Sequence, residues 1–210
     1  MKKEILESDE LFERLIVDAQ ANDDSIENLI IKNSKINNIE IYNLDFSKVE
    51  FEEIEFSEIK SDRMSFTDCE FKNCNLSNTV FDNTSFVRCK FKNCKLTGDM
   101  FTSSRFYNVE FNEVSGNFSN FTMSILENVK YKKSVFRNSY FQECKVKKLE
   151  FLDTDLTQAQ FLKTKLDNID FSSSIISGIV VYVEDLKGAI INEMQAIELV
   201  GLLGVKIAKD

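Results

Sequence analysis

Large apolar residues recur at every fifth position from Ile26 to Ile191, all in one register. This ladder has 34 positions, of which only Ser61 and Gly116 are not large and apolar, and it holds 17 of the 19 Phe. A period of five fits neither an α-helix, which turns every 3.6 residues, nor a strand, which alternates every two. It fits a backbone that turns a corner every five residues, so that four sides close a square coil of twenty. Such a fixed short period predicts a solenoid.

Two further columns of the repeat agree with a square coil. The residue two before each ladder position, here called the partner column, is mostly small, as expected beside a tightly packed Phe. Examples are Cys69, Cys74, Thr79, Thr84, Ser104, Ser119, Ser134, Thr154 and Ala159. Two residues after the ladder position Asn recurs, for example at Asn28, Asn33, Asn73, Asn93, Asn108 and Asn138. Because Asn tolerates turn conformations, we expect this column to form the corners.

Stretches such as CEFKN, CNLSN and TVFDN resemble the pentapeptide-repeat family, whose consensus places a small residue, a polar residue, Leu or Phe, and two polar residues in order. The resemblance covers residues 22–191. It implies an all-β solenoid, a right-handed quadrilateral β-helix of about 8.5 coils. Short α-helices are expected at the two ends, where the open coils must be covered.

The N-terminal residues 1–21 are predicted to form a capping helix. Ser8 or Asp9 can cap it, and its apolar residues fall on one side. These are Leu11, Phe12, Leu15, Ile16 and Ala19.

Residues 192–210 are predicted to form a C-terminal helix and a short strand at 205–208. Asn192 and Gln195 approximate a capping box, and Gly204 is a suitable helix stop. Met194, Ile197, Val200 and Leu203 form an apolar stripe that is wider than a simple cap needs. The segment also resembles the ending of Qnr-type members of the family, which dimerise through it. We therefore expect a homodimer through this stripe, with simple end-capping as the alternative.

The sequence offers no catalytic or metal-binding arrangement. It has no His, no phosphate-binding Gly loop and no nucleophile motif, so neither an enzyme nor a cofactor is expected. All five Cys, at positions 69, 74, 89, 94 and 144, fall in the partner column and are interpreted as small core residues that stay reduced. Without a signal peptide or a membrane-spanning segment, we expect a cytoplasmic protein that does not contact membranes.

A net charge of −9 and the Qnr-type resemblance together suggest a function. Qnr-type proteins are acidic, DNA-shaped rods that bind type II topoisomerases and counter quinolones. The resemblance implies a rod that mimics DNA toward DNA gyrase or topoisomerase IV, without binding nucleic acid itself. Residues 40–70 carry ten acids and three bases. The expected contact residues lie in this run, and they are Glu50, Glu52, Glu53, Glu55, Glu58 and Glu70.

Other features favour a different partner. Residues twenty apart should stack, so Glu70, Lys90, Glu110, Lys130 and Glu150 predict a column of alternating charge. One side, with Val80, Met100, Met123, Tyr140, Leu162, Val180 and Tyr182, is low in charge and partly apolar. The alternative hypothesis is therefore an interaction rod that binds an unrelated protein and has no effect on gyrase. A third hypothesis is that the Lys-rich patch at 130–148 binds an anionic surface.

Three residues depart from the regular pattern. Ser61 and Gly116 interrupt the ladder, and Phe118 is one of two Phe that lie off it. We expect a loop or bulge near these positions, with Phe118 pointing outward or filling the bulge.

Overall fold

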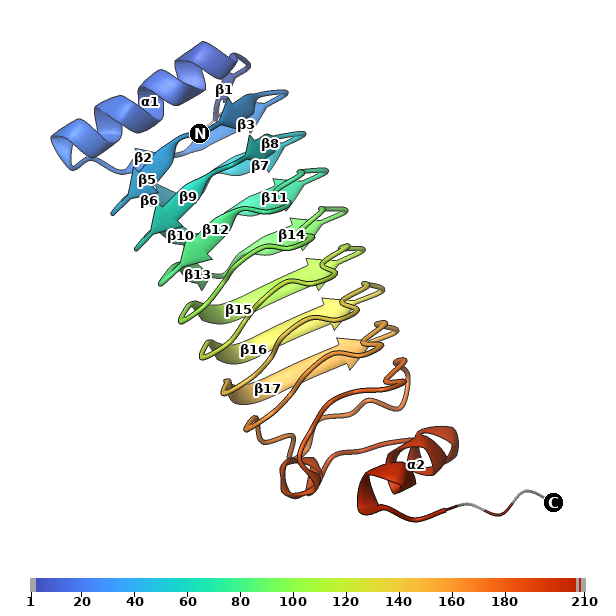
Figure 1. Cartoon of the computed structure of the whole chain (residues 1–210). Coiled ribbons are helices and arrows are strands. Elements are labelled where there is room, and N and C mark those ends of the chain that lie inside the picture. Colours follow the sequence, from blue (N-terminus) through green and yellow to red (C-terminus); the bar gives the residue numbers. More distant parts are fainter. Residues whose placement is uncertain (1–2, 207, 209–210) are drawn as a thin grey trace.

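The computed structural model describes residues 3–206 and 208 and is a right-handed quadrilateral β-helix, which confirms the predicted solenoid (Figure 1). Residues twenty apart pair in parallel along the whole stack, from Ile26 with Phe46 to Asp170 with Ile190. The backbone groups of each coil are therefore satisfied by its neighbours.

The strands are short and fall on the four sides of the coil in turn. They are β1 Glu4–Leu6, β2 Ile26–Glu27, β3 Leu29–Lys32, β4 Lys35–Asn37, β5 Glu40–Tyr42, β6 Asp45–Ser47, β7 Glu50–Glu52, β8 Glu55–Ser57, β9 Lys60–Asp62, β10 Ser65–Thr67, β11 Glu70–Lys72, β12 Val80–Asp82, β13 Ser85–Val87, β14 Lys90–Lys92, β15 Arg105–Asn112, β16 Ile125–Lys132 and β17 Lys145–Leu152. The last three each run across one corner, so that two adjacent sides merge into a single surface.

The ladder residues fill the interior. All are buried except Val146, Leu186 and Ile191, which are half-buried. Rings one coil apart stack face to face, with centroids 4.6 Å apart for Phe51 and Phe71 and 4.5 Å for Phe71 and Phe91. Neighbouring sides contribute edge-to-face contacts, an arrangement that aromatic rings favour.

The partner column has a hydrogen-bonding role that its size alone did not reveal. Most of its hydroxyl and thiol groups donate to the carbonyl oxygen of the residue 23 positions earlier, which is a ladder residue of the preceding coil. Thr84 and Ser119 instead donate within their own coil, and the Thr79 hydroxyl has no partner among the described residues. Ser104 donates to Phe81 at 2.8 Å, Ser124 to Phe101 at 2.7 Å and Cys144 to Phe121 at 3.0 Å. This satisfies carbonyls that face the dry interior.

The corners are left-handed, as the recurring Asn predicted. Asn28, Asn33 and every fifth residue that follows as far as Asn168 have positive φ, with glycine in this role at position 98. Most of these values lie near 55°, where Asn and Gly are the least strained residues.

Ser61 and Gly116 form neither a loop nor a bulge. Ser61 lies in β9, paired with Ile41 and Phe81, and its hydroxyl donates to the carbonyl of Val80 at 2.6 Å. At Gly116 the ring of Phe136 occupies the space, since an added Cβ would lie 2.2 Å from its Cε1 atom. The twenty-residue register therefore continues through both positions.

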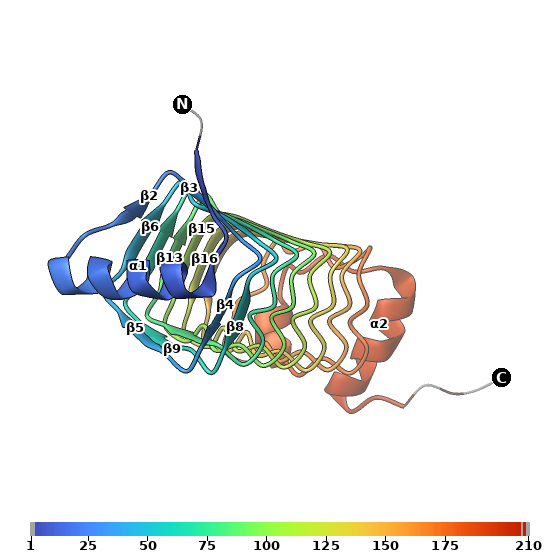
Figure 2. The ribbon, with the colours of Figure 1, turned by 90° about the horizontal axis from the view of Figure 1, so that it is seen from above.

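The first coil is covered by helix α1 (Asp9–Asn22) and by β1, a strand that the sequence had not suggested. Ser8 caps α1, and Phe12, Ile16 and Ala19 are buried beneath it, whereas Leu11 is exposed. The Phe12 ring packs 6.2 Å from that of Phe56. Strand β1 pairs with β3 and protects the edge that α1 leaves open. Figure 2 shows α1 lying across the end of the stack.

The last coil ends in two short 3-10 turns, η1 (Val183–Leu186) and η2 (Gly201–Leu203), around helix α2 (Glu193–Val200). Asn192 and Gln195 form the capping box. Gln195 also donates to the carbonyls of Phe171 at 2.8 Å and Ser174 at 2.7 Å, which fastens α2 to the coil.

The strand expected at 205–208 is not present at Val205, Lys206 or Ala208, which have no neighbouring strand to pair with, and Ile207 lies outside the described residues. Within those residues, neither helix is long and apolar enough to cross a membrane.

Candidate partner-binding surfaces

The six predicted acidic contact residues lie on the N-terminal coils, but four of them are engaged in ion pairs. Glu50 contacts Lys3 at 2.9 Å and Lys72 at 3.3 Å, and Glu55 contacts Lys35 at 2.8 Å. The hydrogen bond from Lys3 holds the pKa of Glu50 below its ordinary value. Glu52 pairs with Lys32, and Glu70 pairs with Lys72 at 3.2 Å. These contacts reduce the charge that the side of β7 and β11 presents to a partner.

Glu53 and Glu58 are different, since both project from left-handed corners and are exposed. Neither takes part in an ion pair with any residue in the described part of the chain. They are the two predicted contact residues whose carboxylates remain available.

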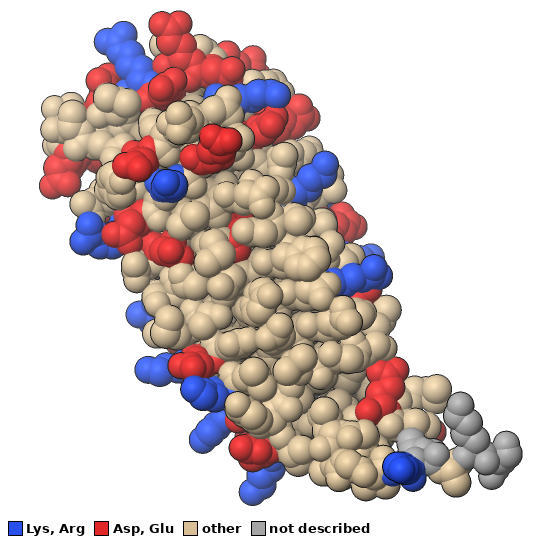
Figure 3. Space-filling model, viewed as in Figure 1, with Lys and Arg blue, Asp and Glu red and all other residues tan. Residues whose placement is uncertain are grey.

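Charge is distributed unevenly along the rod. Residues 1–70 carry 19 acids and 8 bases, whereas residues 71–210 carry 16 acids and 18 bases. Figure 3 shows Asp and Glu concentrated toward the N-terminal end of the face in view. The overall acidity of the chain is therefore a property of its first third.

The predicted column of alternating charge is confirmed by the strand register. Glu70 pairs with Lys90, Lys90 with Glu110, Glu110 with Lys130 and Lys130 with Glu150. The Lys130 ammonium lies 3.1 Å from the Glu150 carboxylate. An acidic stripe does not extend along this side beyond the first third.

The side that continues from β5, β9 and β12 is nearly uncharged beyond Asp82. Its successive outward residues pair in register, and they are Val80, Met100, Asn120, Tyr140, Gln160 and Val180. Figure 3 shows this low charge as a broad area without Lys, Arg, Asp or Glu over the lower part of the molecule.

Phe118 and Met123 stand out on this side because they occupy consecutive corners of one coil. Both have positive φ, near 61° and 60°, and are exposed by 56% and 54%. Phe118 thus points outward, one of the two outcomes expected for it, and fills no bulge. Large apolar residues are unfavourable both in this conformation and in water, so their presence marks a candidate contact site for a protein.

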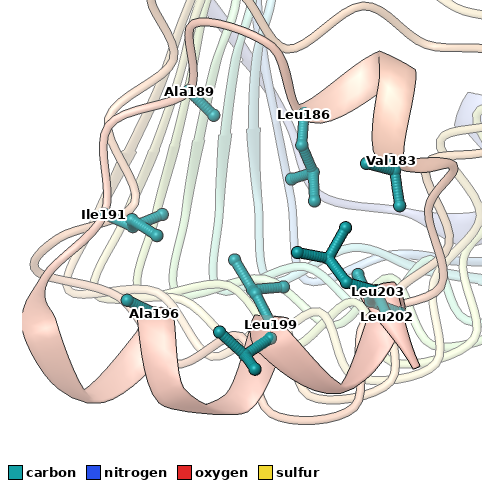
Figure 4. Close-up of a pocket in the computed structure, with 9 residues that line it drawn as sticks. Val183, Leu186, Ala189, Ile191, Ala196, Leu199, Leu202 and Leu203 are labelled. Carbon is teal, nitrogen blue, oxygen red and sulfur yellow. The ribbon is translucent and has the colours of Figure 1, made fainter. Parts of the chain in front are cut away.

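The predicted dimer residues divide between two surfaces. Met194 and Ile197 are exposed by 71% and 52% on the outer side of α2, whereas Val200 and Leu203 line a groove. This groove, of about 290 Å³, lies between α2 and the last coil and is lined by apolar side chains (Figure 4). Opposite α2 its walls are Val183, Leu186, Ala189 and Ile191. The groove had no sequence signal, because it depends on how α2 sits against η1.

The cysteines are buried, and none forms a disulfide. Burial raises the pKa of Cys144 to about 12, and its thiol donates to a backbone carbonyl. No group of three or more His, Cys, Asp or Glu residues in the part of the chain that the structure describes is arranged to hold a metal ion.

Comparison with known proteins gives a family but no curated relative. Two family models, for a pentapeptide repeat region and for pentapeptide repeats in eight copies, match residues 64–134 and 134–172, and together they span more than half of the chain. No curated protein sequence matches.

Solved structures match this chain at low sequence identity. QnrB1, a plasmid-mediated fluoroquinolone resistance protein, is 19% identical over 98% of each chain, with a TM-score of 0.48. HetL, a pentapeptide repeat protein involved in heterocyst differentiation regulation in the cyanobacterium Nostoc, is 10% identical over 85% of this chain and 96% of its own, with a TM-score of 0.49. With the five-residue ladder, the left-handed corners and the family matches in agreement, the chain belongs to the pentapeptide-repeat family.

Proposed function

We propose that this protein is a non-enzymatic, cytoplasmic rod that binds a type II topoisomerase, DNA gyrase or topoisomerase IV, and protects it against quinolones. The observation that carries the proposal is the concentration of negative charge in residues 1–70 of a stiff, regular rod. A rod with carboxylates on its surface can stand where the phosphates of duplex DNA would lie.

The mimicry is confined to the N-terminal third. Beyond β11 the outward charges alternate in sign, and on the side of β7 and β11 lysines already pair with Glu50, Glu52 and Glu70. The unpaired carboxylates of Glu53 and Glu58 are therefore the residues that we expect to replace phosphates.

A gyrase supercoiling assay with and without ciprofloxacin tests this proposal. We expect the wild-type protein at micromolar concentration to inhibit supercoiling or to relieve the drug. Glu53→Lys with Glu58→Lys should abolish that effect. Lys is compatible with these corners, since Lys133 and Lys148 occupy equivalent ones.

The matched control is Glu113→Lys with Asp153→Lys, which changes the same charge at exposed left-handed corners farther along the rod. This control should behave as wild type. If the wild-type protein had no effect on gyrase, the proposed function would be wrong. If both double variants lost the effect equally, the assignment of Glu53 and Glu58 as contact residues would be wrong.

A second candidate function is an interaction rod for an unrelated protein, favoured by Phe118 and Met123 on the nearly uncharged side. Here we expect no effect on gyrase. A photocrosslinking amino acid at position 118 should capture one defined protein in cells, whereas the same amino acid at position 113 should not. Identical products from both positions would contradict this alternative.

For either function we propose a homodimer formed through α2 and the groove beside it. The exposed side chains of Met194, Ile197 and Leu203 would then be covered by a second copy, in a two-fold arrangement.

A further inference from the structure

The merged surface of β14 to β17, here called the basic face, carries cationic side chains that form no ion pair within the fold. Seven exposed cations on it have no ion-pair partner among the described residues, and they are Lys90, Lys92, Arg105, Lys132, Lys133, Lys145 and Lys148. Only three acids on this face are likewise unpaired: Glu110, Glu113 and Asp153. The face is thus locally positive in a chain whose net charge is −9.

The remaining acids of the basic face are already neutralised by neighbours. Glu150 pairs with Lys130 at 3.1 Å, and Glu127 pairs with Lys147 at 2.6 Å. The pKa of Glu127 is held below its ordinary value by the hydrogen bond from Lys147, and the charges of Arg105 and Lys148 add to this. Three cations therefore converge on one carboxylate, which leaves an excess of positive charge around it.

At β16 and β17 the acidic N-terminal third lies too far away to cancel this excess. Strands β16 and β17 are three and four rungs from β11, which at ~4.8 Å per rung is roughly 14 to 19 Å. The Debye length at physiological ionic strength is about 8 Å. An anion close to β16 and β17 therefore responds mainly to the local cations.

The shape of the face indicates which polyanion fits it. Strands β15, β16 and β17 lie side by side as eight-residue strands without an intervening loop (Figure 1). Each strand measures roughly 26 Å along its eight residues at full extension, and the three stacked rungs cover roughly 10 Å along the rod. Tyr107 is the aromatic residue exposed there, so there is no row of rings on which unpaired bases could stack. Such a surface suits the backbone of a duplex rather than a single strand.

We propose that the basic face binds the phosphate backbone of duplex nucleic acid without sequence preference. This goes beyond the proposed topoisomerase contact, which uses the opposite charge on the N-terminal coils, and each can fail without the other. It also departs from the expectation that the chain contacts no nucleic acid, because that expectation followed from the resemblance to DNA-mimicking rods and not from how charge is distributed on this one.

Fluorescence anisotropy of a labelled duplex of about 20 base pairs of arbitrary sequence, at salt concentrations from about 25 to about 200 mM, tests the proposal. Contacts to three to five phosphates should give a log–log salt slope on the order of −3 to −4.5. Lys132→Gln with Lys145→Gln and Lys148→Gln should weaken binding by on the order of tenfold or more at the lowest salt and flatten the slope.

The matched control is Lys48→Gln with Lys60→Gln and Lys95→Gln, three exposed lysines without described ion pairs on other parts of the rod. It makes the same change of net charge and should bind as wild type. The proposal is overturned if the wild type does not bind at the lowest salt, or if both triple variants lose affinity equally. It is also overturned if the basic-face variant loses only salt-dependent self-association in sedimentation, since the partner would then be a second copy of this chain.

Discussion

At the scale of the residue, each position of the repeat meets a separate physical requirement. The ladder side chain fills the interior, the corner residue accepts a left-handed backbone, and the partner residue combines small size with a donor. Leu44, Val129 and Leu149 occupy the partner column without a donor and are buried, so burial is the stricter requirement, whereas most hydroxyl and thiol residues also satisfy an inward carbonyl. These demands act within a single coil and its neighbour, which is why they appear directly in the sequence.

Phe81→Ala should lower the free energy of unfolding by about 3–5 kcal/mol, from lost burial and a cavity that stacked rungs cannot close. The Phe81 ring is 1% exposed and lies 5.4 Å from the ring of Phe101. Phe118→Ala serves as the control, because its ring is 56% exposed, and should change stability by less than about 0.5 kcal/mol. A denaturant titration measures both, and similar losses in the two variants would contradict the assigned burial.

Ser124→Ala should cost about 1–3 kcal/mol, since it removes the donor to the Phe101 carbonyl at 2.7 Å and the acceptor for the Ser104 amide at 3.1 Å. Ser124→Cys should cost less, because Cys144 makes the equivalent bond to Phe121 at 3.0 Å. Chemical denaturation of the wild type and the two variants measures these differences in the free energy of unfolding. If Ala and Cys were equally tolerated, the hydrogen bond would have no part in the stability of this column.

Asp99 should make the protein less stable as pH rises. Its carboxyl is fully buried, accepts a bond from the Thr79 amide at 3.1 Å, and has its pKa raised well above the ordinary value by burial. Below the unfolded pKa of about 3.9, both states are protonated and the carboxyl carries no ionisation penalty. Above it the unfolded chain ionises first, so stability falls by up to about 1.4 kcal/mol per pH unit until the folded pKa is passed.

Asp99→Asn removes this ionisation and should flatten the dependence between about pH 4 and neutrality. Thermal or denaturant unfolding at several pH values compares the two proteins. Parallel profiles would mean that Asp99 is ionised in the folded state.

At the scale of the element, the strands are too short to be stable alone and depend on their neighbours in the stack. Each terminal coil lacks one neighbouring coil, and the exposed edge is covered in a different way at each terminus. At the N-terminus β1 and α1 cover the edges. At the C-terminus Gln195 and Asn192 donate to carbonyls of the last coil, and Glu198 accepts a hydrogen bond from Ser177 at 3.2 Å. These contacts hold α2 in an orientation in which Met194 and Ile197 face outward, whereas Val200 and Leu203 line the groove.

Gln195→Ala should destabilise the C-terminal cap by about 2–4 kcal/mol, since it leaves the carbonyls of Phe171 and Ser174 and the amide of Asn192 without their partner. Hydrogen exchange of the α2 amides should quicken more than that of the central coils. Glu193→Gln, an exposed change on the same helix, should leave exchange nearly unchanged. Uniform quickening throughout the rod would show that Gln195 does not act locally.

At the scale of the whole molecule, function depends on how charge and apolar surface are distributed over a rigid rod. The acidic third, the nearly uncharged side, the basic face and the C-terminal groove lie on different parts of one surface. Because these parts are made of different residues, each can be altered by substitution without changing the side chains of the others.

Ile197→Glu should convert a dimer into a monomer, because it places a charge where a second copy is expected to pack. Ile197 is 52% exposed in the single chain, so folding should be unaffected. Val17→Glu on α1, at 51% exposure, is the matched control at the opposite end and should remain dimeric. Sedimentation at micromolar concentration measures the mass, and a wild-type monomer would end the dimer proposal.

Much of the fold could be predicted from the sequence because a solenoid is nearly one-dimensional. The ladder at Phe51 and Phe71, the corners at Asn28 and Asn33 and the capping box at Asn192 each depend on residues nearby or one coil away. The alternating column from Glu70 to Glu150 followed from the period alone. In this respect the sequence by itself determined the architecture and which residues face outward.

Only the tertiary structure decided how those outward residues interact. Lys3, brought beside Glu50 by β1, and Lys72 neutralise carboxylates that the sequence had offered to a partner. The Phe136 ring fills the space at Gly116, and the seating of α2 on Gln195 opens the apolar groove. The five-residue period defines which face of the coil each side chain leaves from. Ion pairing, the filling of cavities and solvent exposure depend on neighbours that the fold brings together from far along the chain.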